Sequence, residues 1–201
     1  IVKIRILKYN NTHTVSMDFK IVDKYLDSCF QELLRQINRL QSGGTIDSLN
    51  TIGVNTTHQI GASFVSLKQL ASKYSPNEPL ALLLWNTQKR EQQIVSCMLL
   101  PENTNKEKIT QLIQTCLDFE IAEYFGSLYL QKHPQLTEVS ANWLDSENPF
   151  QQTAALTALA RYLILHKKNN KTQTELFQAA IRRNFKDKYV QLLANRYRFN
   201  I

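Results

Sequence analysis

Positively charged side chains are the groups of this 201-residue chain with an evident chemical use. Lysine and arginine number 24 against 17 aspartates and glutamates, which gives a formal net charge of +7. This surplus favours an anionic partner, nucleic acid above all, because phosphate contacts require charge density rather than a sequence code. The alternative is an ordinary solvated face. The C-terminal third holds many of these cations: Arg161, Lys167, Lys168, Lys171, Arg182, Arg183, Lys186, Lys188, Arg196 and Arg198.

Other kinds of site have no support in the residue types and their spacing. Cys29, Cys97 and Cys116 lie far apart inside apolar helical patterns, which favours buried free thiols over metal ligands or disulfides. No CxxC pair, paired histidines or glycine-rich phosphate loop occurs. We therefore expect no metal and no cofactor, and no constellation of residues supports a metal enzyme or another hydrolase. No run of about 18 apolar residues is present, so we also expect no membrane span.

An internal repeat indicates the architecture. Residues Leu84–Leu100 match Trp143–Leu159 at an offset of 59, including two consecutive glutamines in each copy. In both copies a Trp/Leu pair ends one helix, a polar turn follows, and a second helix begins. Trp85 and Trp143 follow apolar runs, which favours core packing over contact with a ligand. One more unit fits between the copies, so the repeat is a helix pair of about 30 residues, and such pairs stack into a curved solenoid.

Apolar residues at helical spacing predict helices over most of the chain, and the predicted fold class is all-α: a HEAT-like helical-repeat solenoid, or α-α superhelix. Ser-Gly-Gly at residues 42–44 is expected to end the first helix with a glycine in the left-handed conformation. Residues 1–16 are expected to be an N-terminal extension outside a single solenoid domain of residues 17–201. The expected helices span residues 18–40, 46–52, 63–73, 80–86, 88–100, 103–116, 118–131, 135–146, 150–166, 174–184 and 188–199.

In a stack of such pairs the second helices line the concave face, so their first residues are candidates for binding. Lys89 and Arg90 occupy one such start, where they are expected either to contact phosphates or to be solvated. Arg90 has the further alternative of pairing with Glu91 or a neighbouring turn. Asp118 and Glu120 occupy the next start, where acids also stabilise the positive end of the helix dipole.

Four segments lie in register along the chain: GASFVSLKQLASKY, LWNTQKREQQ, YLQKHPQL and NWLDSENPFQQTAAL. Together they resemble the DNA alkylation repair family, the AlkD-like DNA glycosylases built from HEAT-like repeats. The resemblance covers about residues 60 to 165. One element is LW-x4-RE, which runs from Leu84 to Glu91, and another is KHP at residues 132–134, followed by Trp143.

The resemblance implies a C-shaped solenoid that holds duplex DNA in a basic concave groove and excises positively charged alkylated purines. An N3- or N7-alkylated purine is already cationic and leaves easily, so little help from a general acid is needed. What remains is to stabilise an oxocarbenium-like sugar with a carboxylate and aromatic faces, and to place a water.

The chain departs from the family's catalytic motif. Active members carry Trp-Asp-x-x-Asp at the start of the helix near residue 118, and the second aspartate is catalytic. This chain reads LDFEI at residues 117–121, so the catalytic position falls on Ile121, or on Phe119 if the register is set from KHP. Asp118 and Glu120 are the two carboxylates close enough to replace it.

The family's DNA-contacting arginine is also replaced, here by Thr153, which leaves the neighbouring Gln152 as a candidate contact. We expect a monomer in the cytoplasm, associated with the bacterial nucleoid, that binds duplex DNA without sequence specificity. The alternative is a non-enzymatic scaffold that binds a protein or peptide in its concave groove; apolar or acidic second-helix starts would favour it. The expected DNA contacts are Lys89, Arg90, Gln152, Arg161, Lys167, Lys168 and Lys188.

Overall fold

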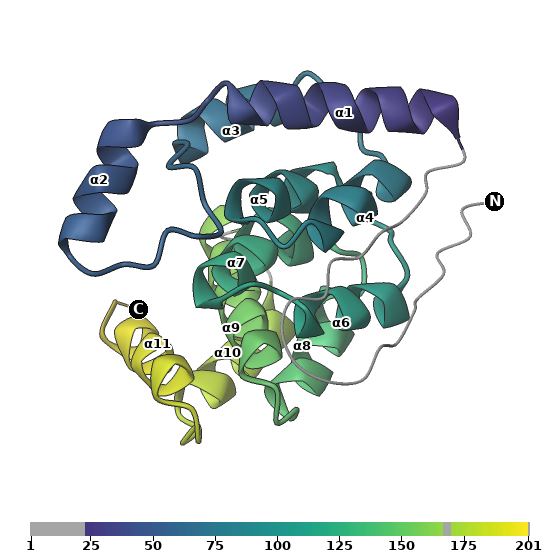
Figure 1. Cartoon of the computed structure of the whole chain (residues 1–201). Helices are drawn as coiled ribbons and strands as arrows, with labels where there is room; N and C mark the ends of the chain where they lie inside the picture. Colours follow the sequence, from purple (N-terminus) through teal and green to yellow (C-terminus); the bar gives the residue numbers. More distant parts are fainter. Residues whose placement is uncertain (1–22, 167–169, 201) are drawn as a thin grey trace, which may run out of the picture.

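A computed structural model of the chain describes residues 23–166 and 170–200. Every regular element in these ranges is helical (Figure 1), which confirms the all-α class. The expected N-terminal extension, Lys167 and Lys168 lie outside the described residues. The elements are α1 (Lys24–Asn38), α2 (Gly43–Thr51), α3 (Phe64–Ala71), α4 (Glu78–Asn86), α5 (Arg90–Leu99), α6 (Lys106–Gln114), α7 (Phe119–Tyr124), the short turns η1 (Phe125–Tyr129) and η2 (Leu130–Lys132), α8 (Leu136–Leu144), α9 (Pro149–Leu165), α10 (Lys171–Ile181) and α11 (Lys188–Asn200).

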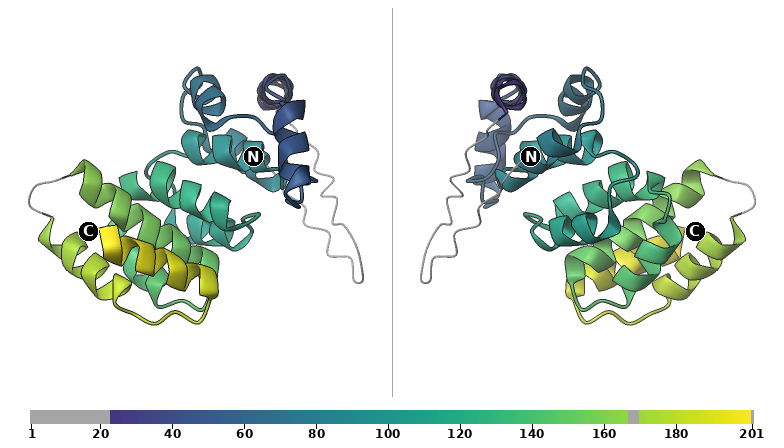
Figure 2. Two further views of the ribbon diagram at one scale, coloured as in Figure 1. Left: turned by 90° about the vertical axis from the view of Figure 1, so that its left-hand side faces the viewer. Right: turned by 90° about the vertical axis from the view of Figure 1, so that its right-hand side faces the viewer.

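Most of the helices stack as consecutive pairs along the chain, while α6 packs on α9. Helix α1 contacts α3, α4 packs on α5, α8 on α9, and α10 on α11. Neighbouring pairs contact through their second helices, since α3 packs on α5, α5 on α7 and η1, α7 and η1 on α9, and α9 on α11. The stack runs from α1 and α3 at one end to α10 and α11 at the other (Figure 2). We call the first turns of α5, α7, α9 and α11 the second-helix row.

Short polar residues begin most of these helices. Ser63 caps α3 by accepting a hydrogen bond from Ser66 N at 3.1 Å. Asn148 accepts hydrogen bonds from Phe150 N (2.9 Å) and Gln151 N (3.2 Å), and Pro149 occupies the first helical position. These caps satisfy amide groups that have no partner inside the helix.

The prediction that Ser-Gly-Gly ends the first helix was wrong. Helix α1 ends at Asn38, followed by Arg39 in the right-handed region, and the two glycines are the first residues of α2. Ser42 accepts a hydrogen bond from Thr45 N at 3.3 Å and so caps the start of α2. The glycines with a positive φ are Gly53 and Gly61 instead. A serine before two small residues therefore served as a helix start here rather than as a stop.

The helix expected over residues 118–131 changes its pitch along its length. A regular segment, α7, is followed by one π-helical turn, η1, and by a 3-10 turn, η2. Gly126 lies in η1 against α9, and a Cβ atom built on it would stand 2.4 Å from Ala154 O and 3.1 Å from Ala158 N. The two backbones therefore approach as closely as they can, and only glycine allows this contact.

Both tryptophans are buried in the core, as the sequence pattern indicated. Trp85 donates to Thr115 Oγ1 (3.0 Å) and Trp143 donates to Thr110 Oγ1 (3.2 Å). Both indole rings pack against Phe125, at centroid distances of 5.5 Å and 6.1 Å. Neither ring is available to a ligand.

The three cysteines are free thiols. Cys97 and Cys116 are buried as expected, whereas Cys29 is only half-buried. Burial raises the pKa of Cys116 to about 12, so its thiol stays protonated at neutral pH. Within the described residues, no helix has the length and apolar character that a membrane span requires.

Candidate nucleic-acid interface

Arg90, at the start of α5, is held by a carboxylate of the next helix pair. Its Nε donates to Glu120 Oε2 at 2.7 Å and its Nη2 donates to Glu120 Oε1 at 2.6 Å. Its Nη1 lies 3.4 Å from both Glu91 Oε1 and Ala62 O. Burial acts to lower the pKa of Arg90, but the Glu120 carboxylate outweighs it and the pKa is raised. The guanidinium is therefore charged and already paired.

Glu91 is the second partner of Arg90 and is fully buried. Its Oε1 accepts a hydrogen bond from Ile60 N at 3.2 Å, while no hydrogen bond to its Oε2 is found within the described residues. Arg90, Glu91 and Glu120 thus tie together the segment before α3, the start of α5 and the start of α7. This triad carries two carboxylates on one guanidinium, so its net charge is negative.

Lys89 holds the segment that returns from α2. Its Nζ donates to Thr57 O at 3.1 Å, and Arg90 N donates to His58 O at 2.8 Å. The His58 ring lies 3.1 Å from Gln88 O, and Gln88 has a positive φ of 53°. An ammonium group has three donors and this contact uses one, so Lys89 keeps donors for a phosphate.

Asp118 is the N-cap of α7. Its Oδ1 accepts a hydrogen bond from Ile121 N at 2.9 Å. Burial raises the pKa of Asp118 above its usual range, although the Ile121 hydrogen bond acts in the opposite direction. Ile121, the position of the family's catalytic aspartate in the ungapped register, is fully buried in the core. Of the residues at 117–121, Asp118 and Glu120 present carboxylates, and Glu120 is engaged by Arg90.

Three aromatic rings meet beside Asp118, and we call Phe119, Phe150 and Tyr189 the aromatic cluster. Phe119 stacks on Tyr189 with centroids 4.2 Å apart and packs edge-on against Phe150 at 5.1 Å. The three residues come from the first turns of α7, α9 and α11, so the second-helix row converges here. Sequence reasoning did not select this cluster. A usable signal was present, because each ring occupies the first or second position of a second helix.

Tyr189 is fixed by its hydroxyl group as well as by its ring. The hydroxyl donates to Glu123 Oε1 at 2.5 Å, and Arg196 Nη2 donates to Glu123 Oε2 at 3.2 Å. Burial and the Glu123 carboxylate both raise the pKa of Tyr189. This network joins α11 directly to α7, across the start of α9, and it orients the ring that covers Phe119.

The remaining predicted contacts are spread over the surface. Gln152 Nε2 donates to Ser146 O at 2.6 Å, and Thr153 beside it is fully buried. Lys188 is exposed at the start of α11, next to Tyr189. Arg161 is exposed on α9 but lies about 18 Å along that helix from its start. Lys89, Arg90 and Lys188 thus belong to the second-helix row, and Arg161 does not.

Acidic partners reduce the cationic excess of the C-terminal third. Arg183 pairs with Asp145 at 2.6 Å, Lys186 with Glu147 at 2.8 Å and Arg196 with Glu123 at 3.2 Å. In the same third, the described cations that form no ion pair are Arg161, Arg182, Lys188 and Arg198. Among the described residues, no group of three histidine, cysteine, aspartate or glutamate side chains is arranged to hold a metal ion.

Comparison with known proteins identifies one family. A family model described as DNA alkylation repair enzyme matches residues 20–190. No curated protein and no solved structure matches the chain. The matched range includes α1 to α10 and the first residues of α11, and with them every residue of the second-helix row described above.

Proposed function

The chain belongs to the DNA alkylation repair enzyme family, and on that basis we propose that it binds duplex DNA along the second-helix row and excises cationic alkylated purines. Its general role is therefore in the repair of alkylated DNA. The proposal also includes the substrate class, the excision reaction and the residues that perform it.

Asp118 supports the carboxylate role better than Glu120 does, and this difference carries the proposal. Glu120 has both oxygens on the guanidinium of Arg90. Asp118 forms no ion pair within the described residues, and the backbone hydrogen bonds that it accepts at the start of α7 leave acceptor capacity on its carboxylate. A partly buried carboxylate stabilises a nearby positive charge more strongly than a solvated one.

The reaction requires little more from the protein than this negative charge. The bond between the sugar C1′ and the purine nitrogen breaks, and its electron pair neutralises the cationic purine. The sugar is left as an oxocarbenium-like cation, which Asp118 stabilises until water adds to C1′ and releases a proton to the solvent. The rings of the aromatic cluster supply polarisable faces beside this carboxylate, where a cation is favoured.

Cations at both ends of the second-helix row support phosphate binding. Lys89 keeps ammonium donors at the start of α5, and Lys188 is exposed at the start of α11. Arg161, Lys167 and Lys168 are proposed as further contacts and Gln152 as a neutral one. Binding through such contacts weakens steeply as salt rises, because each phosphate contact releases a counterion.

One observation favours a second candidate, a scaffold that binds a protein or peptide. The starts of α5 and α7 share a triad of net negative charge, and aromatic rings occupy the starts of α7, α9 and α11, so the row does not present successive free cations. Titration of labelled duplex DNA at two salt concentrations separates the candidates. DNA binding predicts affinity at low salt that falls at high salt, and the scaffold predicts no binding at either concentration.

Release of 7-methylguanine and 3-methyladenine from alkylated duplex tests the excision itself. We expect Asp118→Asn to lower the single-turnover rate by about 100-fold, whereas Glu120→Gln lowers it far less. Asp145→Asn is the control: it makes the same substitution as the Asp118 variant. Asp145 pairs with an arginine as Glu120 does, but it lies outside the second-helix row. No release by the wild type, or full activity of Asp118→Asn, would contradict the proposal.

A further inference from the structure

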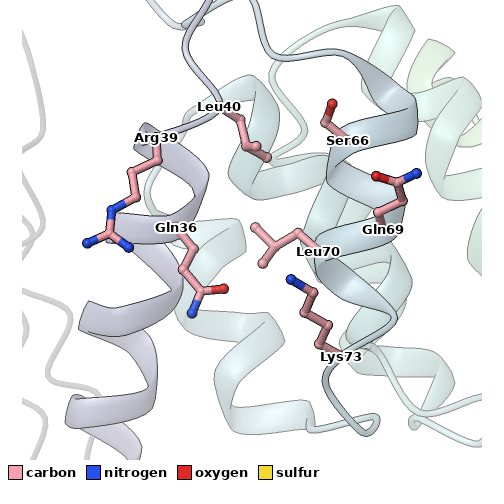
Figure 3. Close-up of a pocket in the computed structure, with 7 residues that line it drawn as sticks. All are labelled: Gln36, Arg39, Leu40, Ser66, Gln69, Leu70 and Lys73. Atoms are coloured by element: carbon pink, nitrogen blue, oxygen red, sulfur yellow. The ribbon is translucent and has the colours of Figure 1, made fainter.

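A groove between α1 and α3 is lined by both polar and apolar side chains (Figure 3). Its volume is about 400 Å³. Gln36 lies on α1 and Arg39 directly follows that helix. Ser66 and Gln69 lie on α3, and Lys73 lies just after it. Leu40 and Leu70 also line it. The groove lies within the terminal helix pair, separate from Asp118 and the aromatic cluster.

The charge of this groove is positive. Neither Arg39 nor Lys73 belongs to an ion pair in the described part of the chain. In Figure 3 the Lys73 ammonium points toward Leu70 and Gln36, while the Arg39 guanidinium points outward at the rim. The carboxylate nearest along α1 is Glu32, whose pKa is lowered by a hydrogen bond from Gln36 and by the charges of Arg35 and Arg39.

Glu32 does not neutralise the groove, because it already has a cation of its own. Arg35 pairs with it at 2.9 Å, and Gln36 Nε2 donates to its other oxygen at 2.8 Å. The two groove cations therefore remain in excess. The Lys73 ammonium lies inside the groove, whereas the Arg39 guanidinium stands at its rim and points outward (Figure 3). This arrangement suits two successive phosphates of one strand rather than a single anion held between both cations.

We propose that this groove binds the phosphodiester backbone of a DNA strand that flanks the lesion site. Cations, amide groups and a hydroxyl satisfy phosphate oxygens without reading bases. The two leucine side chains suit the apolar face of the deoxyribose between phosphates. The volume is sufficient for one phosphate with its sugar. The inference extends the proposed function, since it requires that DNA be the partner.

The groove opens next to the second-helix row. Ser66 lies in the first turn of α3, one turn from Ala62, whose carbonyl accepts a hydrogen bond from Arg90. Phe64, in the same turn of α3, stacks on Tyr124 of α7 with centroids 5.2 Å apart. A strand that leaves the start of α5 along α3 therefore passes Ser66, then Gln69 and Lys73.

The double variant Arg39→Gln/Lys73→Gln tests this site on the whole chain. We expect its affinity for a long alkylated duplex to fall about 10-fold, and the slope of log K against log salt to fall by about 1.8, or 0.9 per phosphate contact. Lys24→Gln/Lys132→Gln is the matched control, because it also removes two positive charges, from exposed lysines outside the groove. Thermal melts verify that both variants are folded.

The excision rate at saturating protein separates this inference from the proposed function. The groove variant should release methylated purine as fast as the wild type once bound, because no groove residue lies at Asp118. If the wild type and the groove variant bind DNA equally, or if the control variant loses as much affinity, the groove proposal is wrong and the proposed function stands. Wild type without salt-dependent DNA binding overturns both. Side-chain amide NMR signals of Gln36 and Gln69 should shift when duplex is added; unshifted signals would also contradict the groove.

Discussion

Arg90 and Glu120 join two successive helix pairs through two parallel hydrogen bonds, of 2.7 Å from Nε to Oε2 and 2.6 Å from Nη2 to Oε1. The arginine had been expected to contact DNA and the glutamate was a candidate carboxylate. Their pairing gives both residues a structural role between the starts of α5 and α7, and it leaves Asp118 as the carboxylate with free acceptor capacity.

Substitution of Arg90 should cost more stability than substitution of Glu120. Arg90→Ala leaves Glu91 fully buried with no cation, so we expect a loss of about 3 kcal/mol in the free energy of unfolding. Glu120 is partly exposed and Glu120→Gln keeps one acceptor, so we expect about 1 kcal/mol or less. Urea denaturation measures both. Equal losses would contradict the role assigned to Glu91.

The cap and the charge of Asp118 should be separable. Asparagine is as good an N-cap as aspartate, so Asp118→Asn should change stability by less than about 0.5 kcal/mol. Asp118→Ala removes the acceptor for Ile121 N and should cost about 1 kcal/mol. Both variants should lose excision alike. Thermal melts and single-turnover release test this, and an active Asp118→Asn variant with an inactive Asp118→Ala variant would assign a purely structural role.

The excision rate should fall at acidic pH, as the Asp118 carboxylate becomes protonated. Burial raises the pKa of this carboxyl, and the ionised form stabilises the cationic sugar. Activity is therefore present above that pKa and lost as pH falls through it, at a pH above the usual aspartate value of about 3.9. A rate profile from about pH 4.5 to about pH 8 measures this, and Asp118→Asn should abolish the acidic limb of any residual activity. If the acidic limb of the pH–rate profile is unchanged in Asp118→Asn, a group other than Asp118 causes the loss of activity.

Thr153 should tolerate an apolar replacement and reject a cation. Its side chain is fully buried, and its Oγ1 has no hydrogen-bond partner among the described residues. Thr153→Val keeps the shape and should be neutral or stabilising by up to about 1 kcal/mol. Thr153→Arg, which restores the residue type of the family at this position, should destabilise by several kcal/mol because a buried guanidinium lacks a partner. Chemical denaturation compares the two; a stable Thr153→Arg variant would show that the side chain reaches solvent.

Gly126 should not accept even the smallest side chain. The added Cβ of Gly126→Ala would meet Ala154 O at 2.4 Å, and this atom belongs to the backbone of α9 and cannot rotate away. We expect a loss of at least about 2 kcal/mol. Gly43→Ala is the matched control, since nothing lies within 4 Å of a Cβ built there. Similar stability of the two variants would contradict the close approach of η1 to α9.

Local patterns were sufficient for the helices themselves. Apolar spacing placed α3 to α6, α8 and α9 within a few residues of their observed bounds, whereas the helix expected over residues 118–131 keeps a regular α-helical pitch only to Tyr124. These features depend on neighbours in sequence, through the helical period and through side chains that bond amides two or three residues away. The internal repeat likewise indicated stacked pairs, because it requires only that similar units pack on one another.

The sequence by itself thus determined an all-α array and its family, and it identified Asp118, Glu120 and Arg90 as residues of interest. Only the tertiary structure decided their relations. The partner of Arg90 lies 30 residues away, and Phe119, Phe150 and Tyr189 come from three successive pairs. Which residues meet depends on the rotation of each helix about its axis and on the offset between pairs. Packing of the whole core sets both, and no local spacing encodes them.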